Sequence, residues 1–170
     1  MNIFASHLDP TVCAKSLDDA RVIKMTLETA QMMSTILRGN GVLFPNVYRS
    51  THAGHKCTVW AGLNQSNFTW LGLHGLALAD EHQRRFPKSP RHKSARIIEQ
   101  SLELSYILPA GDFTAFANAA RREDLGIDFT GIHDPVTAYR YYLNARWFLD
   151  QPRFTNSAPP DWYSPCLSQT

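Results

Sequence analysis

Apolar residues recur every three or four positions along most of the chain, a spacing typical of amphipathic helices. After the capping signal of Asp9, a run without glycine or proline leads from Pro10 to Arg38, with a break expected near residues 16–17. Further helices are predicted at 59–86 with a kink at 64–67, at 94–108, at 113–122 and at 135–149. Only residues 2–5 have an extended pattern. The chain is therefore predicted to be all-α, a compact helical bundle.

Two polar stripes interrupt the apolar pattern of the long helices. On the first helix, four polar residues fall within about 80° of one another: Arg21, Lys24, Glu28 and Gln31. On the second helix, four lie on one line: Asn67, His74, Glu81 and Arg85. Stripes that face each other would build a polar site inside the bundle, whereas stripes that face water would be ordinary solvated surfaces. Both interpretations remain open from the pattern alone.

Length and composition indicate one domain spanning residues 1–170, with a proline-rich tail from about 151 to 170 packing on it. No apolar stretch is long enough to cross a membrane, and the N-terminus lacks the features of a signal peptide, so no membrane partner is expected. The cysteines are odd in number and far apart: Cys13, Cys57 and Cys166. They favour a reducing compartment, and we expect a cytoplasmic protein.

The formal net charge is only +2, but the basic residues are unevenly distributed. Between positions 84 and 96 the chain carries cations and no acid: Arg84, Arg85, Lys88, Arg91, Lys93 and Arg96, with His92 among them. Such a block suits a polyanion-facing surface, and it would equally suit a solvated basic turn.

A further cluster of reactive side chains follows residue 51. His52, His55 and Cys57 have a spacing that zinc could use, but no second pair of ligands stands at a suitable distance, so no metal is expected. A loop that presents imidazoles to an anion or a base fits better, with two exposed loop histidines as the alternative. Phosphate-binding loops, dinucleotide fingerprints and serine-hydrolase elbows are absent, so we expect no cofactor.

Several segments of the first hundred residues resemble a group of small phage-encoded proteins and, more distantly, the pyrimidine-dimer DNA glycosylases of the phage endonuclease V type. The resemblance is carried by Ile3-Phe4, Asp9-Pro10, residues 19–31, Thr51-His52 with His55, Trp60, residues 67–71 and His92-Lys93-Ser94, with a weaker echo near Asn156 and Pro159. It implies a compact all-α domain that kinks damaged DNA, flips a base out and attacks the sugar with its N-terminal amine. A carboxylate assists, and an imine intermediate leads to strand cleavage. The family has threonine after the initiator where this chain has Asn2, and Lys24 and Glu28 are the nearest substitutes for its Arg-Glu pair.

The resemblance and the polar stripes together define the candidate residues. Catalytic candidates are Lys24, Glu28, His52, His55 and Glu81, with the amine of Met1 as an alternative nucleophile. Candidates for DNA binding are Asn2, Arg21, Trp60, Asn67, Arg84, Arg85, Arg91, His92, Lys93, Ser94 and Arg96. A phage DNA glycosylase acting on an extruded pyrimidine is the leading interpretation. A base-modifying transferase that leaves the strand intact and a non-catalytic DNA-binding protein are the alternatives.

Overall fold

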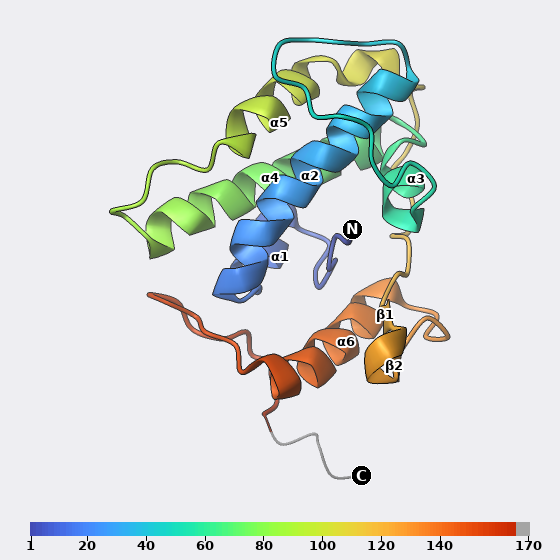
Figure 1. The fold of residues 1–170 in the computed structure, drawn as a ribbon. Helices are drawn as coiled ribbons and strands as arrows, with labels where there is room; N and C mark the ends of the chain where they lie inside the picture. The colour runs from blue at the N-terminus through green and yellow to red at the C-terminus, as the bar shows by residue number, and fades with distance from the viewer. Residues whose placement is uncertain (166–170) are drawn as a thin grey trace.

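The computed structural model describes residues 1–165 and is mostly helical, as the sequence predicts (Figure 1). The helices are α1 (Pro10–Lys15), α2 (Asp19–Gly39), α3 (Lys56–Ala61), α4 (Gln65–Arg85), α5 (Ser94–Glu103) and α6 (Pro135–Asp150). A short antiparallel hairpin joins β1 (Arg121–Arg122) to β2 (Ile127–Asp128). No helix of the described part is long and apolar enough to cross a membrane.

Side chains at the helix starts explain where most helices begin. Asp9 accepts hydrogen bonds from two backbone N–H groups of α1, whose first residue is proline, and Asp134 does the same for α6. Asp18 caps α2 three residues after α1 ends, so the predicted break near residues 16–17 is confirmed. At the other end of α2, the chain turns at Gly41 in a left-handed conformation with φ +76°.

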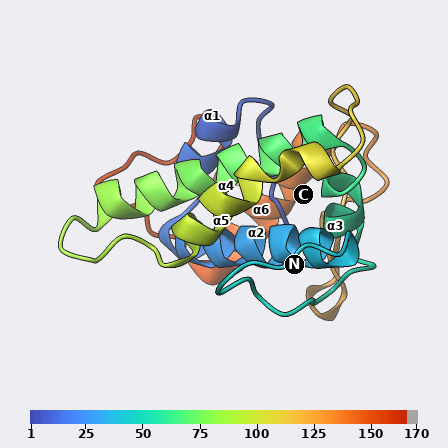
Figure 2. The same cartoon turned by 90° about the horizontal axis from the view of Figure 1, so that it is seen from above.

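The helices α2, α4 and α5 pack closely on one another, and α4 crosses α2 in the centre of the molecule (Figures 1 and 2). Two glycines of α4 allow this approach. A Cβ atom at Gly75 would lie 2.4 Å from Cγ2 of Thr29 and 2.8 Å from Cδ1 of Ile98, and one at Gly72 would lie 2.4 Å from Leu102. The core therefore forms where these three helices meet.

Helix α6 lies on the other side of the N-terminal segment, which runs between α6 and α2 (Figure 1). Phe4 stacks on Tyr142, and Arg140 donates a hydrogen bond to the carbonyl of Ser6 at 2.9 Å. The segment after α6 then returns over the start of α2. We call residues 153–163 the C-terminal strap. It holds α6 and α2 together, since Trp162 stacks on Trp147 of α6 and the carbonyl of Arg153 accepts a hydrogen bond from the N–H of Asp19 in α2.

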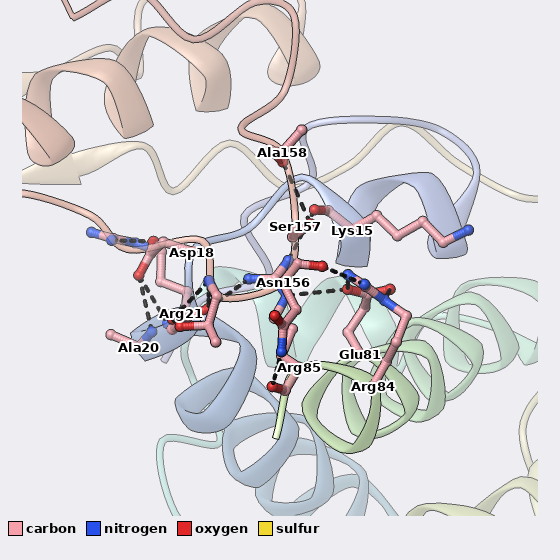
Figure 3. Close-up of polar contacts among 12 residues, drawn as sticks. Lys15, Asp18, Ala20, Arg21, Glu81, Arg84, Arg85, Asn156, Ser157 and Ala158 are labelled. Atoms are coloured by element: carbon pink, nitrogen blue, oxygen red, sulfur yellow. Dashed lines mark hydrogen bonds and ion pairs between the residues drawn. The ribbon is translucent and has the colours of Figure 1, made fainter. Parts of the chain in front are cut away.

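Two polar contacts fix the C-terminal strap to the end of α4 (Figure 3). Arg84 donates to the carbonyl of Asn156 at 2.6 Å, and the side chain of Asn156 donates to the carbonyl of Arg85 at 3.0 Å. The strap thus joins the last described part of the chain to α2, α4 and α6. Cys166 and the rest of the predicted tail lie outside the described residues.

The prediction of a helix at residues 113–122 is wrong. The backbone there is irregular and held by side chains of α4 and its cap: Asn64 donates to the carbonyl of Asp112 at 3.0 Å, and Asn67 accepts from the N–H of Thr114 at 3.0 Å. These long-range bonds replace the local bonds of a helix. Residues 2–5 form no strand either, because the N–H of Asn2 bonds Glu28 and Phe4 has φ +43°.

Two other helix boundaries differ from the prediction. The region expected to be one kinked helix from 59 is divided into α3 and α4, because Asn64 caps a new helix by accepting from the N–H of Asn67. Ser94 is the first residue of α5 rather than its cap, and α5 ends at Glu103, before a 3-10 turn at Ser105–Ile107.

Candidate active site

The amino group of Met1 lies beside the carboxylate of Glu28, in the middle of α2. The amine nitrogen is 3.7 Å from Oε2, and the backbone N–H of Asn2 donates to the same oxygen at 2.9 Å. Lys24, one turn earlier on α2, places Nζ 3.5 Å from Oε1. One carboxylate therefore faces two amines, and we call Met1, Lys24 and Glu28 the amine centre.

The two amines differ in their surroundings. The side chains of Met1 and Glu28 are 2% and 11% exposed, whereas that of Lys24 is 70% exposed. Asn2 fixes the terminus: its side chain donates to the carbonyl of Ala119 at 3.2 Å and accepts from the N–H of Ile3 at 2.8 Å. The amine of Met1 is thus held against a buried carboxylate, and Lys24 stands at the rim.

His55 is electrostatically coupled to the amine centre. Burial lowers the pKa of this imidazole below its ordinary value of 6.5, the positive charges of the Met1 amine and His52 lower it further, and Glu28 opposes them. Its Nδ1 accepts the N–H of Cys57 at 3.2 Å and so caps α3. At neutral pH this histidine is uncharged and has the protonation state of a general base.

His52 and Cys57 do not join His55 in a metal site. Nδ1 of His52 lies 2.6 Å from the hydroxyl of Thr51, in a backbone conformation with φ +50°. The thiol of Cys57 is buried 3.7 Å from the hydroxyl of Tyr139, and burial raises its pKa to about 11. Within residues 1–165, no three His, Cys, Asp or Glu side chains are grouped so that they could hold a metal ion.

Glu81 lies away from the amine centre, at the end of α4 under the C-terminal strap (Figure 3). Both of its oxygens accept hydrogen bonds from Arg84, at 2.8 and 3.0 Å, and Nε of Arg85 donates to Oε2 at 3.1 Å. Burial alone would raise the pKa of this carboxyl, but the bonds from both arginines outweigh burial and lower it. Glu81 is thereby held as a paired carboxylate.

The stripe on α4 is buried, but its partners do not come from the polar stripe of α2. His74 faces the carbonyl of Pro10 at 3.1 Å, and the side chain of Asn67 donates to the carbonyl of Trp60. Arg85 reaches Asp19, at the start of α2, at 3.0 Å. The two stripes therefore build separate polar contacts and not one shared interior site.

The predicted DNA-binding residues fall into two groups. Those buried in the fold are Arg21, Trp60, Asn67, Arg85 and Ser94, and Asn2 is partly buried. The exposed cations are Arg84, Arg91, Lys93 and Arg96, with His92 partly exposed beside them. The second group presents its charge at the outer surface, although Arg91 is paired with Glu99 at 2.7 Å.

The segment before His52 connects the second half of α2 with the start of α5. This segment follows α2, where the N–H of Thr51 donates to Thr35 at 3.0 Å and that of Tyr48 to Ser34 at 3.2 Å. The hydroxyl of Tyr48 lies 3.1 Å from that of Ser94, the residue after Lys93. In contrast, the loop between α4 and α5, with Lys88, projects at the end of the molecule opposite α3 (Figures 1 and 2).

Comparison with known proteins gives one match. A family model described as pyrimidine dimer DNA glycosylase matches residues 1–94. This range contains α1 to α4, the amine centre, His52 and His55, whereas the β-hairpin, α6 and the C-terminal strap lie beyond it. No curated protein and no solved structure matches the chain.

Proposed function

The chain belongs to the pyrimidine dimer DNA glycosylase family, whose model matches more than half of it, and we propose that it excises a damaged pyrimidine with the amine of Met1 as nucleophile. Membership in the family indicates a DNA glycosylase-like activity with DNA as the partner. The observation that carries the proposal is the contact between the Met1 amine and the buried carboxylate of Glu28.

The chemistry of amines favours Met1 over Lys24. As a class, α-amino groups are weaker bases than lysine side chains and are better suited to nucleophilic attack near neutral pH. The Met1 amine is also fixed beside the buried carboxylate of Glu28, whereas the side chain of Lys24 is 70% exposed. We therefore assign attack on the sugar to Met1 and leave Lys24 at the rim of the site.

The proposed reaction begins at C1′ of the deoxyribose. The nitrogen of Met1 attacks C1′, the C1′–N bond to the base breaks, and the base leaves with the electron pair and takes up a proton. Glu28 accepts the proton that the nitrogen loses and gives it to O4′ as the C1′–O4′ bond breaks, which leaves a protonated imine between Met1 and C1′. Glu28 then removes a proton from C2′, and the C3′–O bond breaks with its electron pair on the departing 3′ phosphate, which cuts the strand.

The base must leave the duplex before this attack, at a cost of about a few kcal/mol. The exposed cations Lys93 and Arg96 are suited to hold the phosphate backbone. Ile23 and Leu27, which are 43% and 37% exposed beside Lys24 and Glu28 on α2, offer apolar surface to unstacked bases.

Borohydride trapping on ultraviolet-irradiated duplex DNA tests the proposal. We expect a covalent adduct that peptide mass spectrometry locates on Met1, because borohydride reduces an imine to a stable amine. Glu28→Gln should reduce its yield by about 100-fold or more, in the range of a lost general acid or base. The surface control Glu103→Gln should retain it.

A second experiment tests whether the amine of Met1 is the nucleophile. A few additional residues left on the N-terminus convert the amine of Met1 into an amide, which is not nucleophilic, so trapping should disappear while the fold is kept. An adduct located on Lys24 would refute the assignment to Met1. Tight binding of irradiated DNA with no adduct and no base release would refute the glycosylase proposal.

A further inference from the structure

A small cavity of about 180 Å³ adjoins the amine centre, between α2, the N-terminal segment, β1 and α6. Its chemistry is dominated by four cations: Arg21, Lys24, Arg122 and Arg146. Of the acids in residues 1–165, Asp150 alone lines it, and Phe4 and Tyr142 supply aromatic walls.

Three of the cations have an acid partner that does not line the cavity. Asp18 bonds Nη1 of Arg21 at 2.6 Å, and Glu28 faces Lys24. Asp124 bonds Arg122 at 2.5 and 3.0 Å. The positive sides of these pairs therefore form the wall, and such a concave wall attracts an anion.

Two of the cations also have unused hydrogen-bonding capacity. Asp150 accepts from Nη2 of Arg21 at 2.8 Å and from Nη2 of Arg146 at 2.9 Å. Within residues 1–165, however, the buried Nε of Arg21 and Nη1 of Arg146 have no hydrogen-bond partner. Buried donors without an acceptor are rare and costly, and both belong to arginines that line the cavity.

We propose that this cavity binds a phosphate group, and, resting on the proposed function, that the phosphate belongs to the DNA strand that enters the amine centre. A phosphate offers several oxygens to the planar fork of an arginine, and arginine is the preferred residue for such groups. Lys24 lines the cavity and contacts Glu28. A phosphate held here would therefore set the position of its sugar relative to the carboxylate.

The cavity combines two parts of the chain. Arg21 and Lys24 lie within the segment that the family model matches, whereas Arg122, Tyr142, Arg146 and Asp150 lie after it. The β-hairpin and α6 thus complete a site that the matched segment begins.

Calorimetric titration of the full chain at constant ionic strength tests the proposal, with inorganic phosphate and with an undamaged single-stranded oligonucleotide as separate probes. Arg122→Gln and Arg146→Gln should each weaken both by about tenfold, the value of a lost charge-assisted contact. The matched control is Arg121→Gln: it removes the same charge from the neighbouring residue of β1, which is 52% exposed against 49% for Arg122 but does not line the cavity.

Each outcome decides the proposal. Absent phosphate binding in the wild type, or equal weakening by Arg121→Gln and Arg122→Gln, would overturn it. Binding of phosphate through Arg122 and Arg146 with no effect of either variant on the oligonucleotide would overturn the assignment to DNA. Because neither probe requires catalysis, selective weakening of both probes supports the cavity even where borohydride trapping fails, and the glycosylase proposal would then fail alone.

Discussion

Arg85 is a cation whose side chain is fully buried and paired within the fold. Its side chain has no exposed surface, and it bonds Asp19 at 3.0 Å, Glu81 at 3.1 Å and the carbonyl of Lys15 at 3.1 Å. The guanidinium thereby connects α1, α2 and α4 beneath the C-terminal strap (Figure 3). A buried charge is tolerated only while its partners remain, so we assign Arg85 to the folding of the protein and not to contact with DNA.

Removing this charge should be costly. We expect Arg85→Met to lower the free energy of unfolding by about 3–5 kcal/mol, because it takes the buried cation away from Asp19 and leaves Glu81 with Arg84 as its partner. The control is Arg91→Met, which breaks an exposed pair with Glu99 and should cost less than about 1 kcal/mol. Urea unfolding of the two variants measures the difference, and similar losses would contradict this view of Arg85.

The lowered pKa of His55 predicts a pH dependence of stability. In the folded state this imidazole binds its proton less readily than at its ordinary pKa of 6.5. The folded state is therefore favoured above pH 6.5, and that contribution is lost as the pH falls through 6.5 towards the folded value.

His55→Asn isolates this effect, because asparagine can also accept the capping N–H of Cys57. We expect the wild type to lose more stability than the variant between pH 7.5 and 5, as measured by urea unfolding at both values. Equal losses would show that His55 carries the same charge in the folded and unfolded chain.

Contacts of single residues are predictable from sequence only over short distances. The spacing of Lys24 and Glu28 indicates a pair one turn apart, and the structure contains it. The contact of Glu28 with the Met1 amine depends on the path of the N-terminal segment between α2 and α6. That path is a tertiary property, which explains why the stripe pattern did not indicate it.

The same distinction applies to whole elements. The starts of α1 and α6 are predictable because each has an aspartate cap followed by proline. Residues 113–122 have a comparable local signal in Asp112 but form no helix, since Asn64 and Asn67 supply their hydrogen bonds from far along the chain. The prediction failed there because the deciding partners were distant in sequence.

The close packing of α2, α4 and α5 at Gly75 has a measurable consequence. Alanine there would place a methyl group 2.4 Å from the branched side chain of Thr29, so Gly75→Ala should destabilise the protein by about 1–3 kcal/mol. Gly39→Ala is the control, because nothing lies within 4 Å of the added carbon at the end of α2. Thermal unfolding compares the two, and equal midpoints would contradict the packing argument.

At the scale of the whole molecule, fewer unpaired cations are exposed to DNA than the basic block at residues 84–96 suggests. Of the basic block between 84 and 96, Arg85 is buried and Arg84 and Arg91 are paired with acids. Lys93 and Arg96 are exposed at the start of α5, where Ser94 contacts the hydroxyl of Tyr48. The effective basic surface is therefore smaller than the sequence suggests, and it lies mainly at the start of α5.

This arrangement predicts how salt affects DNA binding. Lys93→Gln and Arg96→Gln should each reduce the slope of log affinity against log salt by about 1, because each removes one phosphate contact. The control is Arg121→Gln on the β-hairpin, which does not line the cavity beside the amine centre and should leave the slope unchanged. Binding isotherms of an undamaged duplex at several salt concentrations give the slopes, and unchanged slopes for Lys93→Gln and Arg96→Gln would exclude this surface.

The C-terminal strap has a consequence for the order in which the protein matures. Asp19 bonds Thr155, and Asn156 bonds both Arg84 and Arg85, so the start of α2 and the end of α4 receive partners that are synthesised more than 60 residues after α4. During synthesis both helices are therefore complete well before the residues that tie them together. The contacts between α2 and α4 that run through the C-terminal strap can form only in a late step of folding.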